Sequence, residues 1–133
     1  MIVLDTHALV WMDRNDSMLG PQTRTLIENT WRSDVVAVSA ISFWETFMLA
    51  DRGRIVLPVP AEAWRVDLLQ AGLREIALDG RVALLAARLE GLHRDPADRF
   101  IVATSFQLGA TLVTADTQIL GWSGDLLRQD ATA

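Results

Sequence analysis

This chain of 133 residues contains no cysteine and no lysine. Without cysteine there can be no disulfide, no thiolate catalysis and no zinc site built on sulfur, and the absence fits a reducing compartment. Without lysine the chain can form no Schiff base and has neither a P-loop lysine nor the lysine that receiver domains place beside their phosphorylated aspartate. A codon bias of the whole genome is the simplest cause of the missing lysine. All twelve basic residues are arginine, which suits bidentate phosphate contact.

Long apolar runs and an excess of positive charge are also missing. The longest apolar segments fall well short of the roughly 20 residues that span a bilayer. Met1 leads directly into a predicted strand, without the basic and apolar regions of a signal peptide. We therefore expect no membrane span, no secretion by signal peptide and, by default, a cytoplasmic location. The net charge of −5 argues against coating nucleic acid through a broad basic surface. It does not exclude a nuclease whose acids hold metal.

The sequence does contain an alternation of short apolar runs and longer helical patterns. Half of its residues are hydrophobic, and its length fits one domain, which we expect to cover residues 1–133. Strands are predicted at 2–4, 35–38, 73–78 and 111–114, and helices at 6–12, 21–32, 39–52, 61–70, 80–92 and 95–108. This alternation predicts an α/β fold, with a mainly parallel central sheet of four to five strands flanked by helices on both faces. We expect residues 121–133 to add an edge strand or to fray.

Four acidic residues lie where a predicted strand ends or a helix begins. They are Asp5, Glu45, Asp98 and Asp116. Every strand of a parallel sheet delivers its carboxyl end to the same side, so acids far apart in sequence can meet there. Carboxylates gathered in this way raise one another's pKa values unless a cation holds them. Hard oxygen ligands suit Mg²⁺ or Mn²⁺, ions that mainly serve phosphate chemistry. The four acids are therefore the candidate catalytic residues.

The three aspartates also have structural interpretations. Asp5 and Asp116 follow strands and could cap the next helix, a position that aspartate favours. Asp95 is a natural N-cap before Pro96, and Asp98 would then lie in the first turn, where the helix dipole favours a negative charge. Because one aspartate suffices for capping, we prefer Asp98 to Asp95 as a metal ligand. Four unrelated local causes would be needed to bring all four acids to one edge of the sheet, which favours function.

Glu45 has a structural interpretation of its own, because Ser42-x-x-Glu45 matches a capping box. Ser39 directly follows the predicted strand and is the better N-cap, which places Glu45 in the second turn among apolar neighbours. A carboxylate there is costly to bury without a partner, so a functional role is favoured. The helix itself is apolar on more than one side. Core packing explains this, and an interface with another chain is the alternative.

Weaker candidates surround the acids. Thr6 and Thr114 could orient a carboxylate or a metal-bound water, although helix capping explains Thr6 equally well. Arg99 could contact an RNA phosphate or form an ion pair that holds an acid, and the ion pair is slightly favoured. His7 and His93 are too isolated to predict a zinc site, and neither is assigned a catalytic role. We expect His7 to be packed or hydrogen-bonded.

Four segments of the chain resemble, in order and spacing, those of a PIN domain, most closely in its VapC toxin branch. They are residues 1–9 (MIVLDTHAL), 39–45 (SAISFWE), 93–99 (HRDPADR) and 112–116 (LVTAD), and residues 51–55 (DRGRI) are also similar. The resemblance covers essentially the whole chain and implies a single PIN-like domain. It carries the acidic quartet of the family onto Asp5, Glu45, Asp98 and Asp116, with Asp95 as an additional acid. The departure is at residues 121–124, where no clear final strand is evident.

The resemblance implies a Mg²⁺- or Mn²⁺-dependent endoribonuclease that hydrolyses RNA phosphodiester bonds with a metal-activated water. Asp5 and Asp98 would be central metal ligands. Asp116 would complete the metal shell together with Glu45, which could also orient the nucleophile. Members of the family generally leave a 3′-hydroxyl and a 5′-phosphate.

The resemblance also implies partners. VapC-like proteins are toxins of type II toxin–antitoxin systems that usually dimerise and are restrained by a cognate VapB-like antitoxin. That antitoxin often projects a basic side chain into the acidic pocket, where an arginine could replace the cation. The main alternative is a noncatalytic PIN-like module that binds RNA or protein, which the retention of all four acids disfavours. A receiver-type regulator would need a paired acidic turn after the first strand and a late lysine. DNA as substrate stays open, because the acids dictate phosphodiester chemistry and not the sugar.

Overall fold

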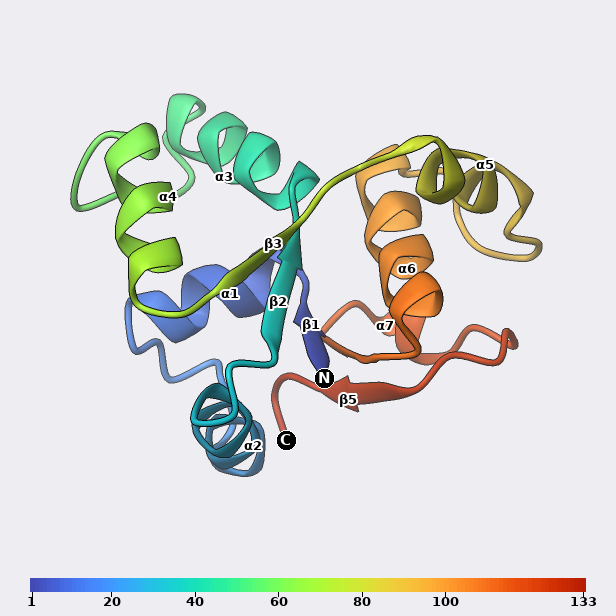
Figure 1. Cartoon of the computed structure of the whole chain (residues 1–133), viewed down its shortest axis with the longest axis horizontal. Coiled ribbons are helices and arrows are strands. Elements are labelled where there is room, and N and C mark those ends of the chain that lie inside the picture. The colour runs from blue at the N-terminus through green and yellow to red at the C-terminus, as the bar shows by residue number, and fades with distance from the viewer.

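The computed structural model describes all 133 residues and contains a five-stranded sheet between two groups of helices (Figure 1). The strands are β1 (Ile2–Leu4), β2 (Val36–Ser39), β3 (Arg74–Ile76), β4 (Thr111–Thr114) and β5 (Arg128–Asp130). The helices are α1 (Thr6–Asp13), α2 (Pro21–Trp31), α3 (Ile41–Asp51), α4 (Ala61–Gln70), α5 (Gly80–Arg88), α6 (Pro96–Leu108) and α7 (Thr117–Leu120). All neighbouring strands are parallel, in the order β3-β2-β1-β4-β5. The predicted α/β fold is confirmed. None of the seven helices combines the length and apolarity needed to cross a membrane.

The central strand β1 supplies side chains to two hydrophobic cores. Ile2 and Leu4 belong to the larger core with residues of α1, α2 and α4, whereas Val3 belongs to a second core with residues of α6 and α7. Figure 1 shows these two groups of helices on opposite sides of the sheet. Successive side chains of a strand point to opposite faces, so three apolar residues in a row suit a strand that is covered on both faces.

The order of the strands reverses at β1. The chain proceeds from β1 to β2 and β3 in one direction, and later fills the other side of β1 with β4 and β5. Crossovers that diverge in this way leave a crevice outside the carboxyl ends of the two strands concerned, where ligands of α/β proteins commonly bind. Leu4 pairs with Val113 in the β1–β4 ladder. The residues that follow them, Asp5 and Thr114, therefore lie side by side at this crevice.

The C-terminal segment forms the edge strand β5, one of the two outcomes expected for residues 121–133. Arg128 fixes the loop before it, because its guanidinium donates to the carbonyl oxygens of Ile119 at 2.6 Å, Gly124 at 2.7 Å and Trp122 at 2.8 Å. The loop is therefore closed around the half-buried side chain of Arg128 as well as by the packing of Trp122 and Leu126. This explains why the apolar pattern of the sequence shows no clear final strand.

Several predicted boundaries differ from those observed. The helix expected over 80–92 ends at Arg88, and the strand expected over 73–78 is limited to β3. Ser39 is the last residue of β2, and Ala40 is the N-cap of α3, so the prediction that Ser39 caps this helix is wrong. The Ser39 hydroxyl still accepts the Ile41 N–H at 3.3 Å. The strand continues to Ser39 because its backbone pairs with Ile76 of β3.

Candidate active site

An acidic cavity of about 370 Å³ opens at the carboxyl ends of β1 and β4. Its lining residues are Asp5, Thr6, His7, Trp11, Glu45, Asp95, Asp98, Ala115 and Asp116. The structure thus brings the four candidate acids together with Asp95, from the β1–α1 junction, α3, the start of α6 and the β4–α7 junction. No arginine lines the cavity. Its negative charge is therefore not balanced by the guanidinium groups of the chain.

Asp5 combines the capping and site positions that the sequence analysis treated as alternatives. Its Oδ1 accepts the Ala8 N–H at 2.8 Å and caps α1, while its Oδ2 accepts the Thr114 hydroxyl at 2.5 Å. Burial raises the pKa of Asp5, and the hydrogen bonds from Thr114 and Ala8 oppose that shift. The Thr114 hydroxyl also accepts the N–H of Asp116 at 3.0 Å. One hydroxyl group therefore connects the ends of β1 and β4 and fixes two of the acids relative to each other.

Glu45 reaches from α3 to the first residue of α1. The Thr6 hydroxyl donates to Glu45 Oε1 at 2.5 Å, and Thr6 Oγ1 lies 3.1 Å from the hydroxyl oxygen of Ser42. The side chain of Glu45 makes no hydrogen bond to the backbone of α3, so it does not form the capping box. Burial is the main cause of the raised pKa of Glu45; the charge of Asp95 adds to the shift, and the bond from Thr6 opposes it.

Asp98 lies in the first turn of α6 and has the largest perturbation of the site. Burial and then repulsion from Asp95 and Asp116 are the leading causes that raise its pKa to about 8. Asp95 caps α6 by accepting the Ala97 N–H at 3.0 Å, as the sequence predicts, and Asp98 lies in the first turn of the same helix. A carboxyl group with such a pKa is largely protonated at neutral pH, and a bound cation would favour its ionised form.

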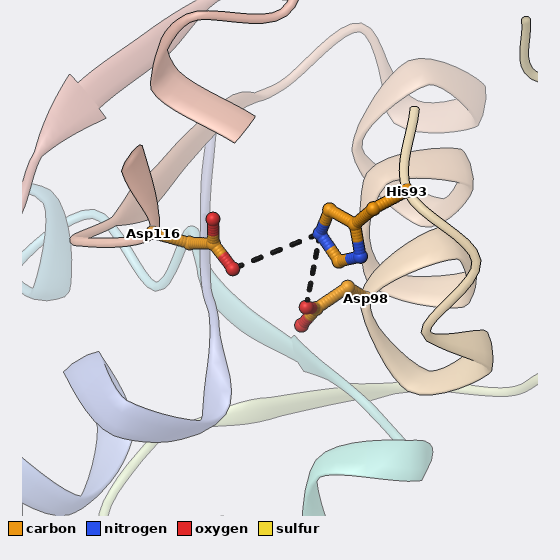
Figure 2. Close-up of side chains that lie close together, drawn as sticks. All are labelled: His93, Asp98 and Asp116. Atoms are coloured by element: carbon orange, nitrogen blue, oxygen red, sulfur yellow. Dashed lines mark ion pairs between the residues drawn. The ribbon is translucent and has the colours of Figure 1, made fainter. Parts of the chain in front are cut away.

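Asp116 completes the ring of acids from the far side of β4. Its Oδ1 caps α7 by accepting the N–H groups of Gln118 at 2.8 Å and Ile119 at 3.2 Å. Its Oδ2 is directed toward Asp98 and His93 (Figure 2). In Asp116, unlike Asp5, one carboxylate oxygen caps a helix and the other has no hydrogen bond from the protein.

His93 belongs to this cluster, although the sequence analysis gave it no role. Its Nε2 lies 3.4 Å from Asp98 Oδ2 and 3.7 Å from Asp116 Oδ2 (Figure 2). This nitrogen is buried without a hydrogen bond. The donor atoms of the three residues lie within 4.8 Å of one another, which is close enough to share one cation. Proximity to Asp95 and Asp98 in the sequence was the available signal, but the contact with Asp116 depends on the tertiary fold.

The ion pair expected for Arg99 is absent. Its guanidinium instead donates to the carbonyl oxygens of Leu89 at 2.6 Å, Ala86 at 2.9 Å and Leu92 at 3.0 Å, with a longer bond to His93 at 3.3 Å. These carbonyls belong to the end of α5 and the loop that follows it. Arg99 therefore stabilises the segment that carries His93. Its bonds go to carbonyl groups at and beyond the point where α5 ends, earlier than predicted.

His7 is exposed at the cavity and packs against Trp11, with ring centroids 6.0 Å apart and the planes inclined by 58°. This matches the packed role expected for His7.

The arrangement suits a divalent cation. Asp98 and Asp116 offer oxygen ligands, and His93 adds a nitrogen donor that has no hydrogen-bond partner. Asp5 lines the same cavity. The mutual repulsion that raises the pKa of Asp98 would be relieved by a positive charge among the carboxylates. Chemically, such a site can bind a phosphate oxygen through the cation and activate a water molecule beside it.

Comparison with known proteins agrees with this chemistry. Residues 2–120 match the PIN domain family. Ribonuclease VapC22 of Mycobacterium tuberculosis is 34% identical over 119 residues, which cover 89% of this chain and 88% of that protein. Among solved structures, a chain of VapBC2 from Rickettsia felis, bound to a DNA fragment from its promoter, has a TM-score of 0.69 and 18% identity, with 97% of this chain and 98% of that chain covered. VapC20 of Mycobacterium tuberculosis, a toxin that cleaves the Sarcin-Ricin loop, has a TM-score of 0.61 and 19% identity, with 92% and 96% covered.

Proposed function

The chain belongs to the PIN domain family, and from this premise we propose that it is a VapC-type toxin that hydrolyses RNA phosphodiester bonds. The observation that carries the proposal is the gathering of Asp5, Glu45, Asp98 and Asp116 around one cavity that no arginine lines. The 34% identity to a ribonuclease over most of both chains supports RNA as the substrate.

The proposed cofactor is Mg²⁺ or Mn²⁺, held by Asp5, Asp98 and Asp116. The ligand atoms of Asp98 and Asp116 lie close to that of His93, and Asp5 lines the same cavity. When bound, the ion would polarise the scissile phosphate, lower the pKa of an attacking water and stabilise the leaving oxygen. The protein contributes orientation. Hydrogen bonds from Ala8 and Thr114 fix the carboxylate of Asp5, so it need not reorganise when the ligand arrives.

Glu45 is proposed to orient the nucleophilic water and accept its proton. The hydroxyl of Thr6 holds one carboxylate oxygen, which leaves the other oxygen for the water. Because burial raises its pKa, Glu45 is a stronger base than an ordinary carboxylate. Asp95 is proposed to act through its charge and through the cap that sets the start of α6.

A cognate VapB-like antitoxin is the proposed protein partner. An acidic cavity without an arginine of its own would accept a basic side chain from such a protein. On α3, Trp44 is 57% exposed and Phe47 is 49% exposed, so core packing does not account for this part of the helix. These two residues support an interface with another chain on α3. The proposed partner there is the antitoxin or a second copy of this chain in a homodimer.

The test is cleavage of a mixed tRNA and rRNA pool by the antitoxin-free protein with Mg²⁺, Mn²⁺ or EDTA. Asp98→Asn is the test variant, and Asp125→Asn is the matched control, because Asp125 is exposed and lies outside the cavity. Discrete products that require both metal and Asp98 are expected, with Asp125→Asn fully active. If folded wild-type protein neither binds metal nor cleaves the pool, the noncatalytic binding module replaces the nuclease.

A further inference from the structure

Trp11 differs from the other half-buried and buried tryptophans in the use of its indole N–H group. The indole groups of Trp31, Trp64 and Trp122 each donate to a protein oxygen, at 3.0, 2.7 and 2.8 Å. The indole N–H of Trp11 makes no such bond. Trp11 is half-buried and lines the acidic cavity. Tryptophan combines a large apolar face with one polar group, and that group usually has a partner when the ring is buried. Trp11 packs against the larger hydrophobic core on one side, and its exposed part lines the cavity with an indole N–H that no protein oxygen accepts.

Helix α1 places this aromatic wall next to the metal-binding acids. Asp5 caps the helix, and His7 and Trp11 have the four-residue spacing that puts side chains on one helix face. Trp11 lies about 9 Å along the helix from Asp5, at a rise of about 1.5 Å per residue. The rings of His7 and Trp11 are inclined by 58° and so do not stack face to face on each other. The cavity is thus lined by two aromatic side chains of α1 and by five acids, with Thr6 and Ala115.

We propose that the His7–Trp11 wall stacks a nucleobase of the nucleotide next to the scissile phosphate. The proposal rests on the proposed ribonuclease function and adds how the site holds its substrate. The acidic walls would bind a phosphate only through a cation, so a second source of affinity must act on an uncharged part of the RNA. Every base offers a π-face, and stacking on an aromatic side chain does not require a charge.

The size and chemistry of the cavity favour this occupant. Its volume of about 370 Å³ is in the range of small-ligand sites and leaves room for one nucleotide. A base can reach Trp11 only if it is not paired and stacked within a duplex. The proposed substrate class is therefore unpaired RNA, such as a loop or a single strand, which is where proteins usually recognise RNA bases.

The experiment measures binding without cleavage. A Glu45→Gln background, which removes the proposed base and keeps the three proposed metal ligands, is mixed in the presence of Mg²⁺ with a fluorescein-labelled adenosine decamer or with a ribose-phosphate decamer that lacks all bases. We expect tighter binding of the base-bearing decamer. Added Trp11→Leu should weaken that binding by about tenfold or more and leave the abasic decamer unaffected, whereas Trp11→Phe should retain the preference because it keeps an aromatic face.

Met12→Ala is the matched control for packing. Met12 contacts the same hydrophobic core as Trp11 but does not line the cavity, so this variant should bind both decamers like the background protein. Equal weakening of the binding of both decamers by Trp11→Leu would overturn the proposal. Equal binding of the two decamers with Trp11 intact, or no binding of either, would also overturn it.

Cleavage of the RNA pool without a base preference in binding would remove only the stacking role. A base preference without metal-dependent cleavage would retain the stacking role and remove the nuclease.

Discussion

The pKa values of carboxyl groups are shifted in opposite directions in two regions of the molecule. At the edge of the sheet, Glu75 of β3 receives two bonds from the guanidinium of Arg65, both at 2.7 Å, and this pair lowers the pKa of Glu75. In the cavity, burial and repulsion raise the pKa values of Asp5, Glu45 and Asp98. The chain has twelve arginines and uses one to neutralise Glu75, yet none lines the cavity. The comparison indicates that the charge of the cavity is left for a cation or a basic group from outside the chain.

The largest expected effect distinguishes the two regions by activity. Asp5→Asn should lower RNA cleavage by about 100-fold or more, because it removes a proposed metal ligand. Glu75→Gln should leave cleavage within about twofold, since the side chain of Glu75 bonds to Arg65 and does not line the cavity. Initial rates with saturating Mg²⁺ would measure both. Loss of activity in Glu75→Gln, with full activity in Asp5→Asn, would show that cleavage depends on the edge of the sheet and not on the cavity.

A second change would make the cavity resemble the edge of the sheet. Ala115 lines the cavity, and Ala115→Arg would introduce a fixed positive charge among the carboxylates. We expect cleavage to fall by about tenfold or more, since the guanidinium would compete with the metal. Thermal melts should show that the added metal no longer stabilises the variant, while the metal-free form is at least as stable as wild type. Ala115→Gln provides the added bulk without the charge; an equal loss of metal stabilisation in this control would assign the effect to bulk.

A third prediction concerns pH and the metal-free protein. The folded pKa of Asp98 is raised from 3.8 to about 8, so the folded state keeps a proton that the unfolded state has already lost. The stabilisation is complete below pH 3.8 and is lost as pH rises toward about 8. Metal-free Tm should therefore fall across this interval, by more than about 5 °C, and saturating Mg²⁺ should reduce the fall. Asp98→Asn should flatten the pH dependence, and an equally steep profile in this variant would exclude Asp98 as its cause.

The smallest expected effect comes from the pair at the edge of the sheet. Because the folded pKa of Glu75 is lowered, its contribution to stability is present above its ordinary value of 4.5 and is lost as pH falls below it. The side chains of Arg65 and Glu75 are 42% and 26% exposed, so solvent screens their attraction. Arg65→Gln should lower Tm at neutral pH by no more than about 4 °C. Melts of both single variants and the double variant would isolate the pair, and a larger coupling would show that it is more than a surface contact.

The sequence predicted the alternation of strands and helices and the positions of the acids because these depend on local signals. Asp5 and Asp116 directly follow buried strands, and Asp98 lies just after a proline-marked helix start. The contacts of His93 and Arg99 could not be predicted in the same way. His93 meets Asp116 only because α6 packs beside β4, and Arg99 bonds to carbonyls whose direction depends on the loop after α5. Strand β5 was ambiguous because Arg-Gln-Asp has no apolar pattern.

The bond between Asp5 and Thr114 has a consequence for synthesis of the protein. It joins two residues 109 positions apart in sequence, one near the start of the chain and one on β4. A ribosome that has made β1, β2 and β3 has therefore produced only part of the site, without the strand that orients Asp5 and carries Asp116. The nascent chain cannot assemble the full set of acids until β4 has left the ribosome. Translation of a toxin of this kind would thus be nearly complete before its product could attack RNA.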